Sequence, residues 1–246
     1  MTAAIERVFP DLRWDHGAGC LTLYLAAGPG WDASYYAALL KDIERDLASR
    51  ADAATRPRIQ EEMNRVRRFC EEVRPPGLPL AIFSCVPDAL FEALRLPEDV
   101  ASSGHFGTAL VLEPLEEQLA RHPPGLAVIV EKDQARVFAV VLDDVHQLGE
   151  VEGRKVSRTR RAGPHSSQRS SRQDQRLNIK QAVDLVVRSG LQGIGLEAIY
   201  LAGPVEARSA FKARLQEPSR RQIRSELQIN PGATAAELAD RIRKKV

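Results

Sequence analysis

One stretch of the sequence, Arg158 to Arg176, combines a glutamine with arginines, serines and a Gly-Pro pair, and contains almost no apolar residue. The amide of Gln168 can donate and accept hydrogen bonds, but it cannot act as a general base at neutral pH. Gln168 could therefore orient a water molecule or bind a developing oxyanion in a site that other groups complete, or be an ordinary exposed residue. Gly163 and Pro164 favour a turn before it. His165 has the chemistry for proton transfer, although most loop histidines have no such role.

Six arginines surround this glutamine, and their charge is the second chemical signal. Residues 154–180 carry nine Lys/Arg and a single acid, Asp174. Such a density favours contact with the phosphates of a nucleic acid, and the alternative is a solvated basic loop. The last three arginines follow each other at spacings of three and four, which would place them on one face of a helix entry. The candidate RNA-binding residues are Arg158, Arg160, Arg161, Arg169, Arg172 and Arg176.

The elements that must position this segment belong to an α/β pattern. Three strands are predicted before it, with the sequences LAVIVE, ARVFAVVL and VHQLGEV, the first two joined as a hairpin. A helix with apolar residues from Leu177 to Val187 follows, then a strand LEAIYLAG and a helix over Ala207–Leu215. About twenty residues without apolar anchors cannot pack into a core, so the basic loop, residues 152–175, is expected to project from this domain.

An earlier domain is predicted upstream of these elements. A strand starts at Cys20, helices cover residues 32–50 and 55–73, a buried strand ends at Ser84, and a short strand lies around residues 108–112. His122-Pro123-Pro124-Gly125 blocks both helix and strand continuation and therefore marks a boundary. The predicted domains are an N-terminal α/β domain at 1–122, a second α/β domain at 123–216 and a short helical tail at 217–246. In that tail, Thr234 and Glu237 fit a capping box.

Composition narrows the class of protein. Residues 1–150 carry 15 Lys/Arg and 24 Asp/Glu, whereas residues 151–246 carry 20 and 9, so the two parts have net charges of about −9 and +11. No apolar run has the roughly 18 to 20 residues that a membrane helix needs, and no signal peptide is recognisable, so a cytoplasmic protein is expected. Cys20, Cys70 and Cys85 are widely spaced, which indicates reduced core residues and neither a disulfide framework nor a zinc knuckle. No metal and no cofactor is predicted.

The order of these elements resembles the class 1 peptide-chain release factors of eukaryotes and archaea, with their bacterial and Vms-like (VLRF) relatives. The similarity covers about residues 20–216, from the strand LTLYLA through the hairpin and basic loop to AIYLAGP and ARSAFKARL. It implies that the second domain is a mixed-sheet, RNase H-like catalytic domain. Gly163 resembles the glycine of the family's catalytic loop, Gln168 its catalytic glutamine, and Arg169 and Arg172 the arginines that follow.

This resemblance implies a ribosome-associated release or rescue factor that acts on rRNA and peptidyl-tRNA, with Gln168 assisting ester hydrolysis in the peptidyl-transferase centre. The Vms-like branch implies cleavage of tRNA near its 3′ end instead. The sequence departs from the family in having no Gly-Gly-Gln triplet, because four residues separate Gly163 from Gln168. A non-catalytic factor that binds ribosomes or rRNA is therefore the alternative. A GTPase or ATPase partner is not identified by any motif.

Reversing charge at Arg169 and Arg172 with Arg169→Glu and Arg172→Glu is expected to weaken ribosome binding and to flatten its salt dependence, because phosphate contacts release counterions. Cosedimentation with ribosomes at increasing salt measures both effects. Arg45→Glu with Arg50→Glu, in the acidic first domain, is the control. Equal binding by the two double variants would contradict the expectation.

Overall fold

The computed structural model describes residues 5, 8–12, 15–28, 30, 32–75, 77–131, 134–152, 177–188, 197–230 and 232–245. The chain divides into two compact units, Met1–His122 and Pro123–Val246. Both units combine helices with a β-sheet, and the second sheet is mixed, so the predicted α/β class is confirmed. Within the described ranges, no helix has the length and apolar character needed to cross a lipid bilayer.

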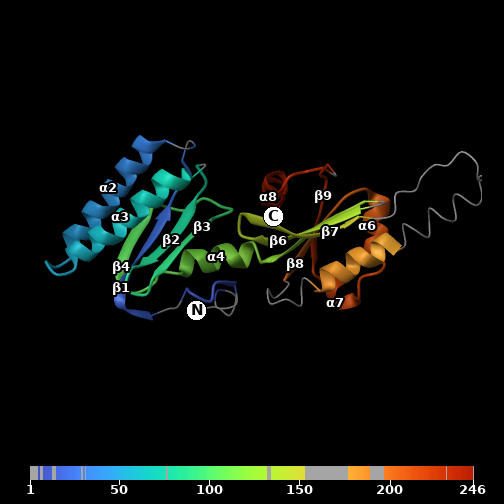
Figure 1. The fold of residues 1–246 in the computed structure, drawn as a ribbon, viewed down its shortest axis with the longest axis horizontal. Helices are drawn as coiled ribbons and strands as arrows, with labels where there is room; N and C mark the ends of the chain where they lie inside the picture. The colour runs from blue at the N-terminus through green and yellow to red at the C-terminus, as the bar shows by residue number, and fades with distance from the viewer. Residues whose placement is uncertain are drawn as a thin grey trace, which may run out of the picture. The chain divides into compact units, whose positions relative to one another are not determined.

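The first unit is an antiparallel sheet with the strand order β3-β2-β1-β4, covered on one face by two long helices (Figure 1). Leucines of β1 pack against both helices and against β2 in one buried cluster. The first long helix begins at Asp32, whose carboxylate accepts hydrogen bonds from the backbone N–H groups of Ser34 and Tyr35 at 2.8 and 3.1 Å. The elements are β1 (Asp15–Leu25), α2 (Ala33–Arg50), α3 (Arg56–Val73), β2 (Leu80–Cys85), β3 (Leu90–Arg95), β4 (Ser103–Ala109) and α4 (Glu113–Arg121).

Two features of this unit differ from the sequence-based expectation. Strand β3 was not predicted, because the sequence LFEALR has the composition of a helix and forms a strand only through its pairing with β2. The strand expected around residues 108–112 lies earlier, at Ser103–Ala109, where it pairs with β1. Helix α4 then follows.

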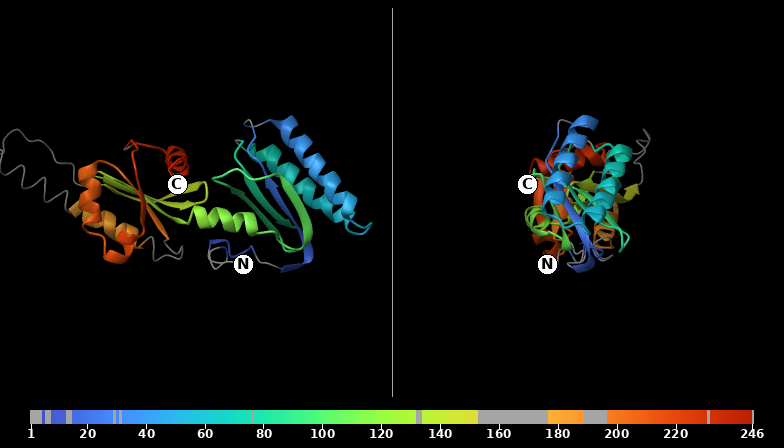
Figure 2. Two further views of the ribbon diagram at one scale, coloured as in Figure 1. Left: turned by 180° about the vertical axis from the view of Figure 1, so that it is seen from behind. Right: turned by 90° about the vertical axis from the view of Figure 1, so that its left-hand side faces the viewer.

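The second unit is built on a five-stranded mixed sheet with the order β7-β6-β5-β8-β9. Strands β5, β6 and β7 are antiparallel neighbours, whereas β8 runs parallel to β5 and β9 runs parallel to β8. Figure 2 shows the sheet from behind, with its helices. The elements are β5 (Gly125–Val130), β6 (Gln134–Val141), β7 (Asp144–Glu152), a helix at residues 177–188, β8 (Ala198–Ala202), α6 (Val205–Lys212), α7 (Glu217–Arg221), β9 (Ile223–Leu227) and α8 (Ala235–Arg243).

Helices cover both faces of this sheet, which explains the continuous apolar run in β5. Leu126, Val128 and Val130 pack with the helix at 177–188 and with α6. Ala127 and Ile129 point to the other face and pack with α8. All six residues of β5 are buried, as expected for a strand with both faces covered. The predicted hairpin, third strand, long helix and following strand are confirmed.

The prediction of a helical tail at 217–246 is wrong over Ile223–Leu227, which form strand β9 at the edge of the sheet. The pairing shifts between Ile199↔Ile223 and Tyr200↔Ser225, so β9 contains one extra residue. This bulge turns Ile223 and Leu227 toward opposite faces and hides the two-residue alternation that identifies a strand. Helix α8 does begin with the predicted capping box between Thr234 and Glu237.

Gly203 ends β8 in a backbone conformation that side chains disfavour, with φ of +118°. A Cβ atom there would lie 1.9 Å from the carbonyl oxygen of Val130, at the end of the neighbouring strand β5. Glycine is therefore required for the chain to leave β8 close against β5.

Gly203→Ala is expected to lower the free energy of unfolding of the second unit by about 1–3 kcal/mol from backbone strain alone. The clash between the new Cβ atom and the Val130 carbonyl oxygen would lower it further. Denaturant-induced unfolding followed by circular dichroism measures the loss. Gly232→Ala is the matched control, since a Cβ atom at that position meets nothing within 4 Å. Similar unfolding of the two variants would contradict this account of Gly203.

Candidate functional site

The predicted catalytic and RNA-binding residues all lie outside the residues that the structure describes. The segment 153–176 contains every one of them. They are Gly163, Gln168, Arg158, Arg160, Arg161, Arg169, Arg172 and Arg176. The described residues on either side of this segment show which elements carry it.

The segment leaves the sheet at the edge where the parallel strands end. Glu152, the last residue of β7, pairs with Gln134 at the start of β6. Val130, the last residue of β5, pairs with Ala135 of the same strand. Because β8 and β9 run parallel to β5, their carboxyl ends face the same edge. In open α/β sheets this is the edge at which ligands usually bind.

The segment returns to the structure in a buried helix. In the helix at 177–188, Ile179, Ala182 and Val186 are at most 2% exposed and pack in the same core as the strands. Leu185 of this helix lies against β7, because a Cβ atom at Gly149 would be 3.2 Å from its side chain. The residues on both sides of segment 153–176 thus belong to elements of one packed core.

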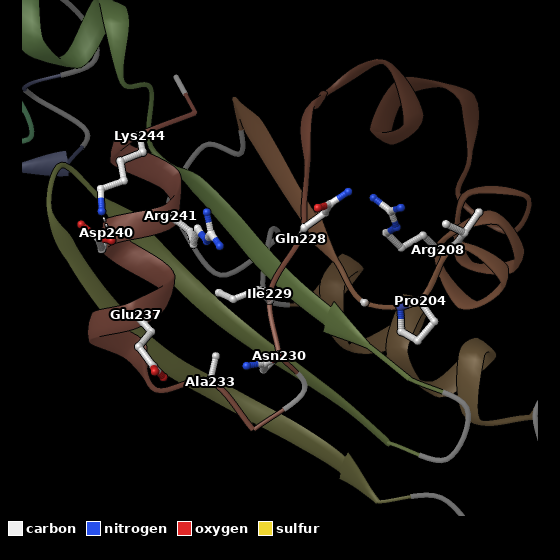
Figure 3. A pocket seen from close by; sticks show the side chains of 12 residues that line it. Pro204, Arg208, Gln228, Ile229, Asn230, Ala233, Glu237, Asp240, Arg241 and Lys244 are labelled. Atoms are coloured by element: carbon white, nitrogen blue, oxygen red, sulfur yellow. Dashed lines mark hydrogen bonds and ion pairs between the residues drawn. The ribbon is translucent and has the colours of Figure 1, made fainter.

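A pocket of about 790 Å³ lies at the carboxyl ends of β8 and β9. Segment 153–176 leaves the sheet at the corresponding end of β7, but β7 and β9 are the two outermost strands, on opposite sides of the sheet. Its wall combines the turn after β8, the chain after β9 and one side of α8 (Figure 3). The side chains of Arg208 and Gln228 point toward one another, while Arg241 and Lys244 line the α8 side.

The acids of this pocket are engaged with neighbours in the structure. Asp240 accepts a hydrogen bond from Nζ of Lys244 at 2.7 Å, and Glu237 accepts one from the backbone N–H of Thr234 at 2.8 Å. Lys244 and its neighbours hold the pKa of Asp240 below its usual range, and the Thr234 contacts do the same for Glu237. The pocket therefore combines basic side chains, amides and two acids that neighbouring groups already engage.

Glu226 on β9 ties α6 to the edge of the sheet beside this pocket. One carboxylate oxygen lies 2.7 Å from Nη1 of Arg208 and the other lies 2.5 Å from Nζ of Lys212. The hydrogen bond from Lys212, with the charge of Arg208, lowers the pKa of Glu226. The Arg208 side chain is only 11% exposed, so this contact is partly shielded from solvent.

Comparison with protein-family models identifies the family to which the chain is related. Residues 111–245 match the family model described as bacterial archaeo-eukaryotic release factor family 10. The chain belongs to this family. The match contains all of segment 153–176 and continues through β9 and α8, so it extends past the predicted limit at residue 216. Comparison with curated proteins found no match.

The solved structures that this chain matches include an archaeal translation termination factor, aRF1, and two Pelota proteins. The aRF1 structure is 18% identical with a TM-score of 0.37, over 98% of this chain and 70% of that chain. Pelota of Thermoplasma acidophilum is 16% identical with a TM-score of 0.30, over 65% and 46%. Pelota of Archaeoglobus fulgidus is 12% identical with a TM-score of 0.31, over 69% and 46%. This chain thus spans about half of each Pelota chain, and its family membership rests on the family model.

Sequence reasoning missed two groupings that the structure brings together. The pocket joins residues from 203–208, 228–233 and 237–244, and no spacing in the sequence connects them. In the first unit, His16, Cys20 and Cys85 lie side by side, although the cysteines were interpreted as isolated core residues. All three cysteines are buried and free, as predicted, but Cys20 and Cys85 are neighbours. The two glycines between His16 and Cys20 were the available signal.

Because its folded pKa is depressed, Glu226 stabilises the second unit above its ordinary pKa and loses this contribution as the pH falls through the folded value. Glu226→Gln should therefore flatten the loss of stability below about pH 4.5 and cost less than about 1 kcal/mol near neutral pH. Unfolding curves recorded from pH 7 to pH 3 measure this. Glu217→Gln, at an exposed acid that pairs with arginines of its own helix, is the control. An identical pH profile for wild type and Glu226→Gln would contradict the assignment.

Proposed function

We propose that this protein releases nascent chains from stalled ribosomes by hydrolysing the ester that joins the chain to tRNA, with Gln168 in the reacting site. The observation that carries the proposal is the family match over 111–245, which contains the whole basic segment around Gln168. The attachment of this segment to β7 and to a buried helix supports it further, because a catalytic loop needs a fixed base.

The proposed reaction is attack by water on the ester carbonyl carbon. The water oxygen forms a bond to this carbon, the bond from the carbon to the ribose oxygen breaks, and a proton ends on the ribose oxygen. Gln168 would orient the water through its carbonyl oxygen, or donate a hydrogen bond to the oxyanion through its amide N–H. Gly163 would give the loop its turn. The products are a free peptide and an intact tRNA.

The arginines of the segment would bind RNA and would take no part in the hydrolysis itself. Six guanidinium groups within 158–176 match the phosphates of rRNA and of the tRNA acceptor end, and Arg can bind phosphate through two hydrogen bonds at once. We further propose that the catalytic unit is Pro123–Val246, including β9 and α8, and that residues 1–122 form a separate N-terminal domain. The protein would work in the cytoplasm, where ribosomes are.

A non-catalytic ribosome-binding factor is the second candidate, favoured by one observation. Pro164, His165, Ser166 and Ser167 separate Gly163 from Gln168, so the loop has no Gly-Gly-Gln triplet. Proline stiffens the backbone before the glutamine. Such a loop could bind rRNA without placing the Gln168 amide beside the ester bond of peptidyl-tRNA.

The deciding experiment incubates stalled ribosomes, carrying labelled peptidyl-tRNA, with wild-type protein or the Gln168→Ala variant. Wild-type protein is expected to release peptide and leave the tRNA intact. The variant should bind equally well but release peptide about 10²–10³-fold more slowly, because one hydrogen-bonding group at the reacting atoms is lost. Gel analysis of the peptide and of the tRNA 3′ end measures both products.

Gln173→Ala is the matched control, because it removes the same amide from the same segment. Equal release by wild type and Gln168→Ala would remove Gln168 from the reaction. Tight binding without any product would favour the non-catalytic factor. A shortened tRNA would instead show the endonuclease activity that the Vms-like branch implies.

A further inference from the structure

Three metal-ligating side chains meet in the first unit, far from the segment discussed above in sequence. One ring nitrogen of His16 and the sulfurs of Cys20 and Cys85 all lie within 4.8 Å of one another. His16 is 8% exposed, and the two cysteines are 0% exposed. Both cysteines are free thiols in the structure.

The local backbone explains how His16 and Cys20 come together. Residues four apart in a regular strand are separated by about 13 Å along the chain. Strand β1 departs from regular pairing between Asp15 and Cys20, and Gly17 and Gly19 both have positive φ, at 52° and 80°. These two glycines allow the start of β1 to fold in a way that side chains would resist. The irregular start of β1 therefore creates the cluster.

The neighbouring strand holds the third ligand in place. Leu21 pairs with Ser84, so Cys20 and Cys85 are adjacent across the β1–β2 ladder. Glu62 is 3% exposed and accepts hydrogen bonds from Oγ of Ser84 at 2.5 Å and from the backbone N–H of Val86 at 2.6 Å. Because these residues flank Cys85 on both sides, the Glu62 carboxylate fixes the backbone that presents its thiol.

His16 is oriented by a carboxylate in the manner typical of metal-binding histidines. Its Nδ1 lies 2.7 Å from Oδ2 of Asp88, in the turn after β2. Its Nε2 is buried and has no hydrogen-bond partner among the described residues. A carboxylate on one ring nitrogen fixes the tautomer and leaves the other nitrogen as a ligand. Leaving that nitrogen without any partner would cost stability, so a bound group is the economical explanation.

We propose that His16, Cys20 and Cys85 bind a thiophilic metal cation, represented by Zn²⁺, with Asp88 as the positioning residue for His16. Two thiols and one imidazole are ligands that Zn²⁺ prefers, and tetrahedral coordination leaves a fourth position for water. On binding, each thiol loses its proton to solvent, so the two thiolates balance the charge of the cation. Zn–S bonds of about 2.3 Å place two sulfurs about 3.8 Å apart, so ligand atoms within 4.8 Å need only small side-chain movements.

A disulfide between Cys20 and Cys85 is the competing fate of these side chains, but both are free thiols in the structure.

The experiment measures zinc in the full-length protein purified from cells under reducing conditions, by inductively coupled plasma mass spectrometry. Wild type and Cys70→Ser should carry about one Zn²⁺ per chain, because Cys70 is a buried thiol outside the cluster. His16→Ala and Cys85→Ser should lose it. Replacing zinc by Co²⁺ should give a thiolate-to-cobalt absorption band, which disappears in Cys20→Ser.

Asp88→Asn keeps the test independent of folding defects in the buried variants, because the Asp88 side chain is 43% exposed. It should weaken Zn²⁺ binding about 10- to 100-fold, as loss of an outer-shell carboxylate does. Asp42→Asn, at an exposed acid paired with Arg45, should leave the affinity unchanged. Equal zinc content in wild type and His16→Ala would overturn the proposal. A Cys20–Cys85 disulfide in the protein as isolated, or no cobalt band in wild type, would overturn it as well.

Discussion

The parallel pairing of β5 with β8 is the constraint on which the second unit depends. Antiparallel strands can be joined by a tight turn, but parallel neighbours need a crossover that returns the chain to the other end of the sheet. Here the crossover runs from the end of β7, through residues 153–176 and the helix at 177–188, to β8. The basic segment is therefore part of a connection that the topology demands. A long connection at this place costs little stability, because the entropy of closing a loop grows only slowly with its length.

The parallel pairing of β5 with β8 also determines where the chain leaves the strands of the second unit. Parallel strands share one carboxyl edge, so β7, β8 and β9 all deliver chain to the edge at which β5 ends. Gly203 lets the chain turn sharply there, and Glu226 ties α6 to the outermost strand. The buried strands β5 and β8 hold these turns in fixed register. In the first unit the equivalent role falls to β1, whose irregular start defines the His16 and Cys20 positions.

The sequence allowed prediction wherever a local pattern and the final environment agreed. The apolar run before Lys132 and the one after it could only be buried strands, and the helical spacing from Leu177 to Val187 matched a helix with one buried face. Strand β3 could not be predicted, because its residues favour a helix and only the partner strand overrules them. For β9, a single extra residue removed the alternation. The ends of the candidate catalytic segment were predictable, whereas its own arrangement lies outside the described residues.

Long-range contacts were the other part that spacing could not reveal. Cys20 and Cys85 are 65 positions apart, and only the register of β1 against β2 brings them together. The role of α8 is another example, because its sequence shows an amphipathic helix but not the surface that it covers. That role decides how the protein can be divided for study. A chain ended at residue 216 would lack both β9 and α8, leaving β8 as an open edge and uncovering Phe138 and Tyr200. Such a fragment would expose an unpaired strand and an apolar patch, and it would be prone to aggregate. The smallest useful piece therefore runs to the end of α8, at Arg243.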